Sequence, residues 1–169
     1  MLTTGIDTSG TLVGSKGTTS TDGNDTFNAV VDNTTATGVN NQTWTGLDNL
    51  DGGKGNDTIN FNDLTATTAV LNLTTGTIKN IETMNVKTVG DLTLNTTTVE
   101  GLETLNTTKT LFAKLTAATT TDVNVSGASG VITVDGGKNI SVTDATVNKD
   151  ITIGAGTKNA GTITVTDTK

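Results

Sequence analysis

Residues 81–85 read Ile-Glu-Thr-Met-Asn and residues 102–106 read Leu-Glu-Thr-Leu-Asn, so one pattern returns after 21 positions. Around these copies, short segments place Val, Ile or Leu at every second position, as in Asp122-Val-Asn-Val-Ser126 and Val131-Ile-Thr-Val-Asp135. Alternation with a period of two is typical of a β-strand with one buried face. Two successive intervals between segment centres total about 20 residues, a repeat length that indicates a solenoid.

We therefore predict an all-β fold, a right-handed parallel β-helix or β-roll of about 20 residues per coil. The simplest coil holds two short strands and two turns, with Asn and Thr ladders along its turns and outer faces. Continuing the 21-residue shift would place Val123 opposite Leu102, and further strands are expected over Ala69–Thr74 and Leu111–Leu115. A β-sandwich is the alternative, but the absence of Pro and the scarcity of hairpin dipeptides favour the solenoid.

The composition of the 169-residue chain excludes several functions. The chain has net charge −7 and contains no Cys, His, Tyr or Arg. These absences remove the usual general base, the thiol nucleophile and zinc sites built on His or Cys. An acidic chain with few aromatic residues also lacks the basic footprint and stacking surfaces of a nucleic-acid binder. The remaining carboxylates, amides, hydroxyls and carbonyls are the ligands that Ca²⁺ prefers.

Residues 52–60 carry the clearest chemical motif. They read Gly52-Gly-Lys-Gly-Asn-Asp-Thr-Ile-Asn60 and fit the calcium-binding nonapeptide G-G-x-G-x-D-x-U-x, in which U is apolar. Gly52, Gly53 and Gly55 permit positive φ and let carbonyl oxygens turn toward a cation. Asp57 supplies negative charge. The alternative is a set of ordinary turns between strands.

Two weaker copies of this motif accompany it. Gly46 and Asp48 occupy the corresponding positions of the preceding nonapeptide, and Gly23-Asn-Asp-Thr-Phe-Asn28 matches residues 55–60 at five of six positions. Consecutive nonapeptides of a β-roll lie on opposite sides, so a full calcium site usually needs motifs 18 residues apart. Asp25 and Asp57 are 32 positions apart, and the excess is similar in length to the stretch 31–44. If that stretch loops out, the two Gly-Asn-Asp-Thr copies stack on one face and share a Ca²⁺.

These motifs divide the chain into three expected parts. Residues 1–19 are expected to form a flexible N-terminal segment, residues 20–61 a calcium-binding β-roll with a loop at 31–44, and residues 62–169 a Thr-rich β-solenoid. The start lacks the features of a secretory signal, which suggests a piece of a longer protein or export by another route. No apolar run reaches the length of a membrane span.

The motif Gly23–Asn28, the run Leu47–Phe61 and the segment Ile78–Val86 together resemble RTX-repeat surface-layer (S-layer) proteins of Gram-negative bacteria. The resemblance implies secretion by the type I route, location on the bacterial cell surface, and calcium-dependent folding and self-assembly into a lattice. It also implies a partner, lipopolysaccharide, bound through parts outside this sequence. The calcium contacts that it implies are Gly23, Asp25, Gly46, Asp48, Gly52, Gly53, Gly55 and Asp57. The repeats are few, so cooperative binding of many calcium ions is not implied.

Three alternatives remain for the function. A segment of a large RTX adhesin would carry the same motifs. An ice-binding protein would present Thr-x-Thr pairs, but the pairs here recur at unequal spacings. A polysaccharide-cleaving enzyme would use paired carboxylates. The candidate pairs are Asp48 with Asp51 and Glu100 with Glu103, and without Arg, His or Tyr to bind sugar acids we expect no enzymatic activity.

Overall fold

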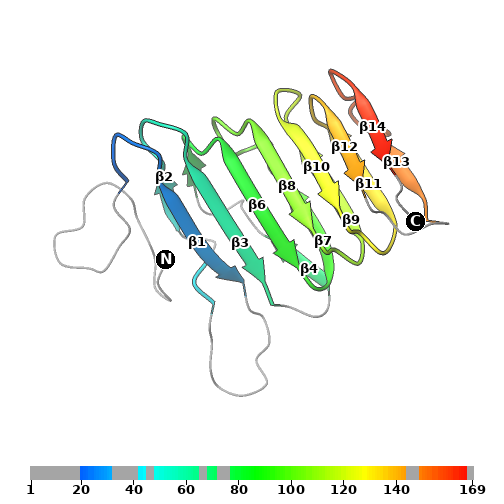
Figure 1. Cartoon of the computed structure of the whole chain (residues 1–169), viewed down its shortest axis with the longest axis horizontal. Coiled ribbons are helices and arrows are strands. Elements are labelled where there is room, and N and C mark those ends of the chain that lie inside the picture. The colour runs from blue at the N-terminus through cyan, green and yellow to red at the C-terminus, as the bar shows by residue number, and fades with distance from the viewer. Residues whose placement is uncertain are drawn as a thin grey trace, which may run out of the picture.

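The computed structural model describes residues 20–31, 42–44, 48–64, 68–71, 77–143 and 149–166. These residues form parallel strands stacked coil upon coil from the N-terminal end to the C-terminal end (Figure 1), and they contain no helix. The predicted parallel β-solenoid is therefore confirmed. The expected N-terminal segment 1–19 lies outside the described residues, as do residues 32–41 of the expected loop.

The largest sheet has seven strands, one from each successive coil. They are β1 (Thr26–Val31), β3 (Thr58–Asp63), β6 (Thr83–Thr88), β8 (Thr104–Thr108), β10 (Asp122–Ser126), β12 (Ile140–Thr143) and β14 (Ile163–Thr166). Every pair of neighbours in this sheet is parallel. The sheet runs without interruption through the expected domain boundary at residue 61, which lies inside β3.

A second sheet of five strands lies across the core from the first. It contains β4 (Thr68–Leu71), β7 (Asp91–Asn95), β9 (Ala113–Ala117), β11 (Ile132–Gly136) and β13 (Ile151–Ile153). A third, small sheet pairs β2 (Asn49–Asp51) with β5 (Thr77–Lys79) and continues as one bridge from Lys79 to Glu100. The coils that contain β2 and β5 thus carry three strands, where two were expected.

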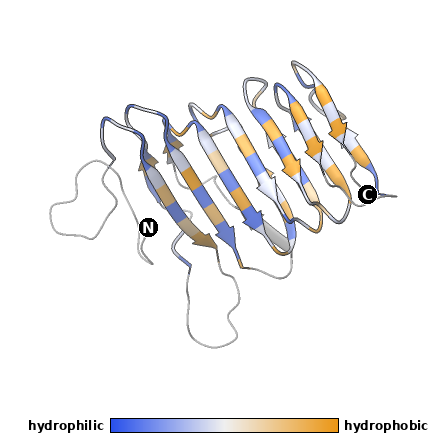
Figure 2. Ribbon diagram, viewed as in Figure 1, coloured by the Kyte–Doolittle hydropathy of each residue, from blue (hydrophilic) through white to orange (hydrophobic). Residues whose placement is uncertain are grey.

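The core consists of the inward-facing side chains of successive coils, which stack in rows. One row of the seven-stranded sheet contains Phe27, Ile59, Met84, Leu105, Val123 and Ile140, none more than 1% exposed. Burying a side chain of this size stabilises the fold by roughly 1.5–3 kcal/mol. Outward-facing positions are mostly polar, and the alternation is visible as bands along each arrow (Figure 2). The period of two in the sequence therefore reflects one inward and one outward face per strand.

Two details of the strand predictions are wrong. Val123 lies opposite Leu105 and not opposite Leu102, because the interval between β8 and β10 is 18 residues and not 21. The strand expected over Leu111–Leu115 begins at Ala113, and the exposed side chains of Leu111 and Phe112 belong to the preceding turn. Turn length differs from coil to coil, so an exact repeat of 21 does not extend through the chain.

Candidate cation site

The candidate site lies where the chain enters β1 and β3, at the two copies of Gly-Asn-Asp-Thr. Thr26 pairs with Thr58 in the parallel register of these strands. The Thr58 amide donates to the carbonyl oxygen of Asp25 at 2.9 Å, and the Asn56 amide donates to Oδ1 of Asn24 at 2.9 Å. The two copies therefore stack one upon the other, as their separation of 32 residues predicted.

Asp57 is the most buried carboxylate of this stack. Asp57 is only 1% exposed. Oδ1 accepts a hydrogen bond from the Asp25 amide at 2.7 Å, whereas Oδ2 is buried without a hydrogen-bond partner among the described residues. A buried carboxylate oxygen with no donor is costly. It is stabilised only if a proton or a cation occupies the adjacent space.

Gly52 packs directly against this oxygen. A Cβ atom built on Gly52 would stand 2.4 Å from Oδ2 of Asp57 and 1.9 Å from the carbonyl oxygen of Asn80. Two oxygen atoms from different coils thus lie close together beside the Cα atom of Gly52, and any side chain at residue 52 would clash with both. Convergent carboxylate and carbonyl oxygens are hard ligands of the kind that Ca²⁺ takes. The motif needs glycine at residue 52 because the backbone of Asn80 approaches too closely for a side chain.

The electrostatic environment of Asp57 also favours a positive ligand. Burial raises the pKa of Asp57 above its ordinary value, and the negative charges of Glu82, Asp25 and Asp51 raise it further. The hydrogen bond from the Asp25 amide lowers this pKa but does not cancel the increase. Glu82 contributes a second contact, because its Oε2 accepts the Asp57 amide at 2.6 Å. A cation at Oδ2 would relieve the repulsion that these charges create.

The carboxylate of Asp25 is hydrogen-bonded to Thr21. Its Oδ2 accepts the Thr21 amide at 2.5 Å and its Oδ1 accepts the Thr21 hydroxyl at 3.2 Å. Asp25 therefore reaches Asp57 through its backbone amide. The geometry supports a positioning role for Asp25, whereas the sequence suggested that both copies share a Ca²⁺.

The glycines of the two copies permit close contact between coils. A Cβ on Gly55 would stand 2.8 Å from the carbonyl oxygen of Gly23, and a Cβ on Gly53 would stand 2.8 Å from that of Thr21. Gly53 and Gly55 also have positive φ, at 92° and 118°. These glycines place backbone against backbone, and so they contribute to the shape of the site.

The copy at residues 43–51 lies in a different sheet. Asp48 is fully buried just before β2, and its carbonyl oxygen accepts the Thr77 amide at 3.1 Å. Gly46 lies outside the described residues. Asp51 pairs with Lys79 at 2.9 Å, which lowers the pKa of this carboxyl, as does the hydrogen bond from Asn80.

Among the residues that the structure describes, no group of three or more Asp, Glu, His or Cys side chains is arranged to hold a metal ion. The predicted contacts Asp25, Asp48 and Asp57 therefore do not form one three-carboxylate site. The residues that fit a cation are Asp57 and the carbonyl group of Asn80, with Glu82 beside them. Carboxylate oxygens together with a backbone carbonyl oxygen suit Ca²⁺, which accepts both kinds of ligand.

Sequence reasoning missed Asn80 and Glu82. The signal that could have found Glu82 is the pattern Glu-Thr-Met-Asn at residues 82–85, which lies in the same register as Asp-Thr-Ile-Asn at 57–60. Acid, Thr, apolar residue and Asn recur at the start of β1, β3, β6 and β8. Asn80 gave no signal, because its contribution comes from a backbone carbonyl group.

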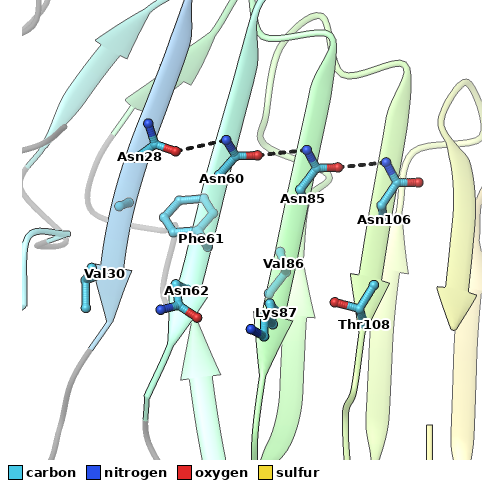
Figure 3. A pocket seen from close by; sticks show the side chains of 11 residues that line it. Asn28, Val30, Asn60, Phe61, Asn62, Asn85, Val86, Lys87, Asn106 and Thr108 are labelled. Atoms are coloured by element: carbon cyan, nitrogen blue, oxygen red, sulfur yellow. Dashed lines mark hydrogen bonds between the residues drawn. The ribbon is translucent and has the colours of Figure 1, made fainter. Parts of the chain in front are cut away.

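A second polar feature lies on the outer face of the seven-stranded sheet. Asparagine side chains of neighbouring strands form a ladder in which each amide donates to the side-chain oxygen of the asparagine in the preceding coil at 2.8–3.0 Å, in part shown in Figure 3. Its members are Asn28, Asn60, Asn85, Asn106 and Asn124. The ladder borders a shallow groove of about 420 Å³, with Lys87 on the other side. The predicted Asn ladder is thereby confirmed, and its bonds hold successive coils in register.

No protein-family model and no curated protein matches this sequence. Within the described part of the chain, no helix is long and apolar enough to cross a membrane.

Proposed function

We propose that this chain is part of a structural protein of a secreted bacterial surface layer, folded and assembled with Ca²⁺. The observation that carries the calcium part is the buried Oδ2 of Asp57, which has no hydrogen-bond partner among the described residues and lies near the carbonyl oxygen of Asn80. The surface-layer part is supported by the resemblance of residues 23–28, 47–61 and 78–86 to RTX-repeat S-layer proteins. In that setting the protein leaves the cell by type I secretion and forms a lattice, with lipopolysaccharide bound elsewhere.

The extended solenoid supports a structural role. Its inward faces are filled by apolar side chains and its outward faces carry Asn, Thr and Lys. Of the acidic residues considered for catalysis, Asp51 is occupied by Lys79, Asn80 and the Gly53 amide. Repetition of coils gives shape and stacking surfaces, which are the properties that a lattice protein needs.

A calcium titration followed by circular dichroism and by Trp44 fluorescence tests this proposal. Trp44 is the only Trp, is 2% exposed and lies edge-on against Phe61 of β3, the strand that directly follows Asp57. We expect Ca²⁺ to raise the Tm and to order the N-terminal coils, with little change after residue 83, because metal binding stabilises the state that holds the site. Mg²⁺ at equal concentration is the control, since it dehydrates less readily.

Two results would reject parts of the proposal separately. An unchanged spectrum and Tm on addition of Ca²⁺ or chelator would reject the calcium site. Electron microscopy of the protein with Ca²⁺ then tests the surface layer, for which we expect two-dimensional arrays. Calcium binding without arrays would favour the alternative, a calcium-stabilised segment of a large RTX adhesin.

A further inference from the structure

The carbonyl group of Asn80 is a second unpartnered acceptor of the candidate site. Among the residues that the structure describes, no N–H or O–H group donates to its oxygen atom, and none donates to Oδ2 of Asp57. A Cβ atom on Gly52 would stand 1.9 Å from the first oxygen and 2.4 Å from the second, so the two oxygen atoms lie close together. Whatever fixes the carbonyl group of Asn80 therefore also shapes the site.

The backbone of Asn80 adopts a conformation that glycine prefers. Its φ is 51°, and within the described ranges Lys109 is the other non-glycine residue with a positive φ. Asn80 stacks between Gly52 of the preceding coil and Gly101 of the following coil, and φ of Gly101 is 89°. The left-handed region is unfavourable for a residue with a Cβ atom. Glycine would occupy this position more easily than asparagine, so we expect the asparagine side chain to have a role.

The side chain of Asn80 ties the residue to the preceding coil. Its Nδ2 donates to Oδ1 of Asp51 at 2.7 Å. The same Oδ1 accepts the Gly53 amide at 3.1 Å, and Oδ2 of Asp51 pairs with Nζ of Lys79 at 2.9 Å. Protein groups thus engage both oxygen atoms of Asp51. The contact between Asp51 and the unpartnered carbonyl group runs through Asn80.

Two backbone hydrogen bonds complete this support. The Asn80 amide donates to the carbonyl oxygen of Glu100 at 3.0 Å, and the Gly52 amide donates to that of Lys79 at 3.0 Å. The amide of Asn80 therefore bonds the following coil, while its side chain bonds the preceding one. The orientation of the carbonyl group depends on both contacts, because rotation of the backbone at residue 80 would break one of them.

We propose that Asp51 and Asn80 are positioning residues of the cation site. Asp51 holds the side chain of Asn80, and this contact keeps residue 80 in the left-handed conformation. That conformation places the carbonyl oxygen beside Oδ2 of Asp57. The role rests on the proposed calcium binding and adds to it the residues that orient a ligand. Groups that orient metal ligands typically change metal affinity by about 10–100-fold when they are replaced.

Asn80→Gly tests this role, because glycine accepts the same φ, keeps the carbonyl group and changes no charge. The variant removes the hydrogen bond to Asp51. We expect calorimetry of the full chain with Ca²⁺ to show an affinity about 10–100-fold weaker than that of the unmodified chain. Lys109→Gly is the matched control, since Lys109 also has a positive φ, 61°, and lies in the turn between β8 and β9. Its calcium affinity should equal that of the unmodified chain.

A double-mutant cycle tests the role of Asp51. Asp51→Ala removes the acceptor of the Asn80 side chain, whereas Asp51→Asn keeps a side-chain oxygen that can accept it. Asp51→Ala should weaken calcium binding as Asn80→Gly does, and Asp51→Asn should weaken it less. The losses of Asp51→Ala and Asn80→Gly should not add in the double variant, because Asp51 acts through Asn80. Equal losses for the two Asp51 variants, or losses that add, would overturn the positioning role.

Hydrogen exchange measured by NMR in chelator gives a readout that needs no calcium. The amide proton of residue 80, bonded to Glu100, should exchange faster in Asp51→Ala than in Asp51→Asn, because Asp51→Ala releases the Asn80 side chain. Equal exchange rates would overturn the positioning role. If the unmodified chain binds Ca²⁺ and Asn80→Gly binds it equally well, the positioning role is wrong and the calcium site stands. If the unmodified chain binds no Ca²⁺, both are rejected.

Discussion

Replacing Asp57 by asparagine removes the charge of the buried carboxylate while keeping its shape. The side-chain oxygen of the introduced asparagine can still accept the Asp25 amide, which now bonds Oδ1 of Asp57 at 2.7 Å. Its amide group would take the place of Oδ2, which lies near the carbonyl oxygen of Asn80, and could donate to that oxygen. We expect Asp57→Asn to stabilise the metal-free protein at pH 7 by about 1–3 kcal/mol, the cost of an unsatisfied buried polar group.

The pH dependence of this effect has a definite sign. The pKa of Asp57 is raised in the folded state, mainly by burial, so the folded chain holds this proton more tightly than the unfolded chain. The contribution of Asp57 to stability is therefore complete below its unfolded pKa and is lost as the pH rises through the folded pKa. The advantage of Asp57→Asn in chelator should be small near pH 3 and should grow toward neutral pH.

Calcium should reverse the order of the two proteins. A ligand at 100 times its Kd stabilises the folded state by about 2.7 kcal/mol, and Asp57→Asn loses the carboxylate on which the proposed site depends. With Ca²⁺ the unmodified chain should then match or exceed the variant. The assay is thermal unfolding followed by circular dichroism, in which 1 kcal/mol shifts the Tm by roughly 2–4 °C for a chain of this size.

The control for this experiment is Asp22→Asn. Asp22 lies on the same edge, but its side chain is 83% exposed and pairs with Lys54 at the surface. Loss of an exposed ion pair costs little, so this variant should change neither the metal-free Tm nor the calcium response. The reasoning is refuted if Asp57→Asn destabilises the metal-free protein at pH 7, or if its effect does not change between pH 4 and pH 7.

Three further predictions concern the solenoid itself, each measured by urea unfolding. Asn85→Ala removes two ladder hydrogen bonds and should cost about 1–3 kcal/mol, roughly twice the cost of Asn28→Ala at the described end of the ladder. Leu105→Ala creates a cavity in a fully buried row and should cost about 2–5 kcal/mol, whereas Leu111→Ala, at a side chain 44% exposed, should cost well under half of that. Gly136→Ala should cost more than about 1 kcal/mol, because φ of Gly136 is 76° and a Cβ would stand 2.1 Å from the carbonyl oxygen of Ala117. A neutral result for any of these three variants would contradict its prediction.

The sequence predicted the repeat of the solenoid better than its registers. Alternation located most strands, since a side chain in a strand faces either the core or the outside. Alternation did not settle where β9 begins, because Leu111, Ala113 and Leu115 alternate as one series. The strand begins at Ala113, whose amide bonds the carbonyl oxygen of Val131 in the next coil. The separations along the Asn ladder are 32, 25, 21 and 18 residues. A coil can lengthen or shorten in its turns without altering its strands.

The calcium motif was likewise visible, and its individual roles were not. The matching Gly-Asn-Asp-Thr copies predicted that residues 23–26 stack on residues 55–58, and they do. Asp25 and Asp57 have the same local sequence but different surroundings. Asp57 lies between β1 and β6 and loses its water, while Asp25 lies in the first described coil and bonds Thr21. The coil on each side of a carboxylate decides how deeply it is buried, and local sequence does not record it.

The sequence by itself therefore determined the strand period, the parallel coils, the Asn ladder and the location of the glycine-rich turns. Those features depend on the pattern within one coil and its near repeat. Tertiary structure alone decided which oxygens converge beside Gly52, and which apolar residues remain exposed at β14. Ile140 and Ile163 show the reason, because both begin similar alternating strands and, among the described residues, a further coil is stacked upon Ile140 alone.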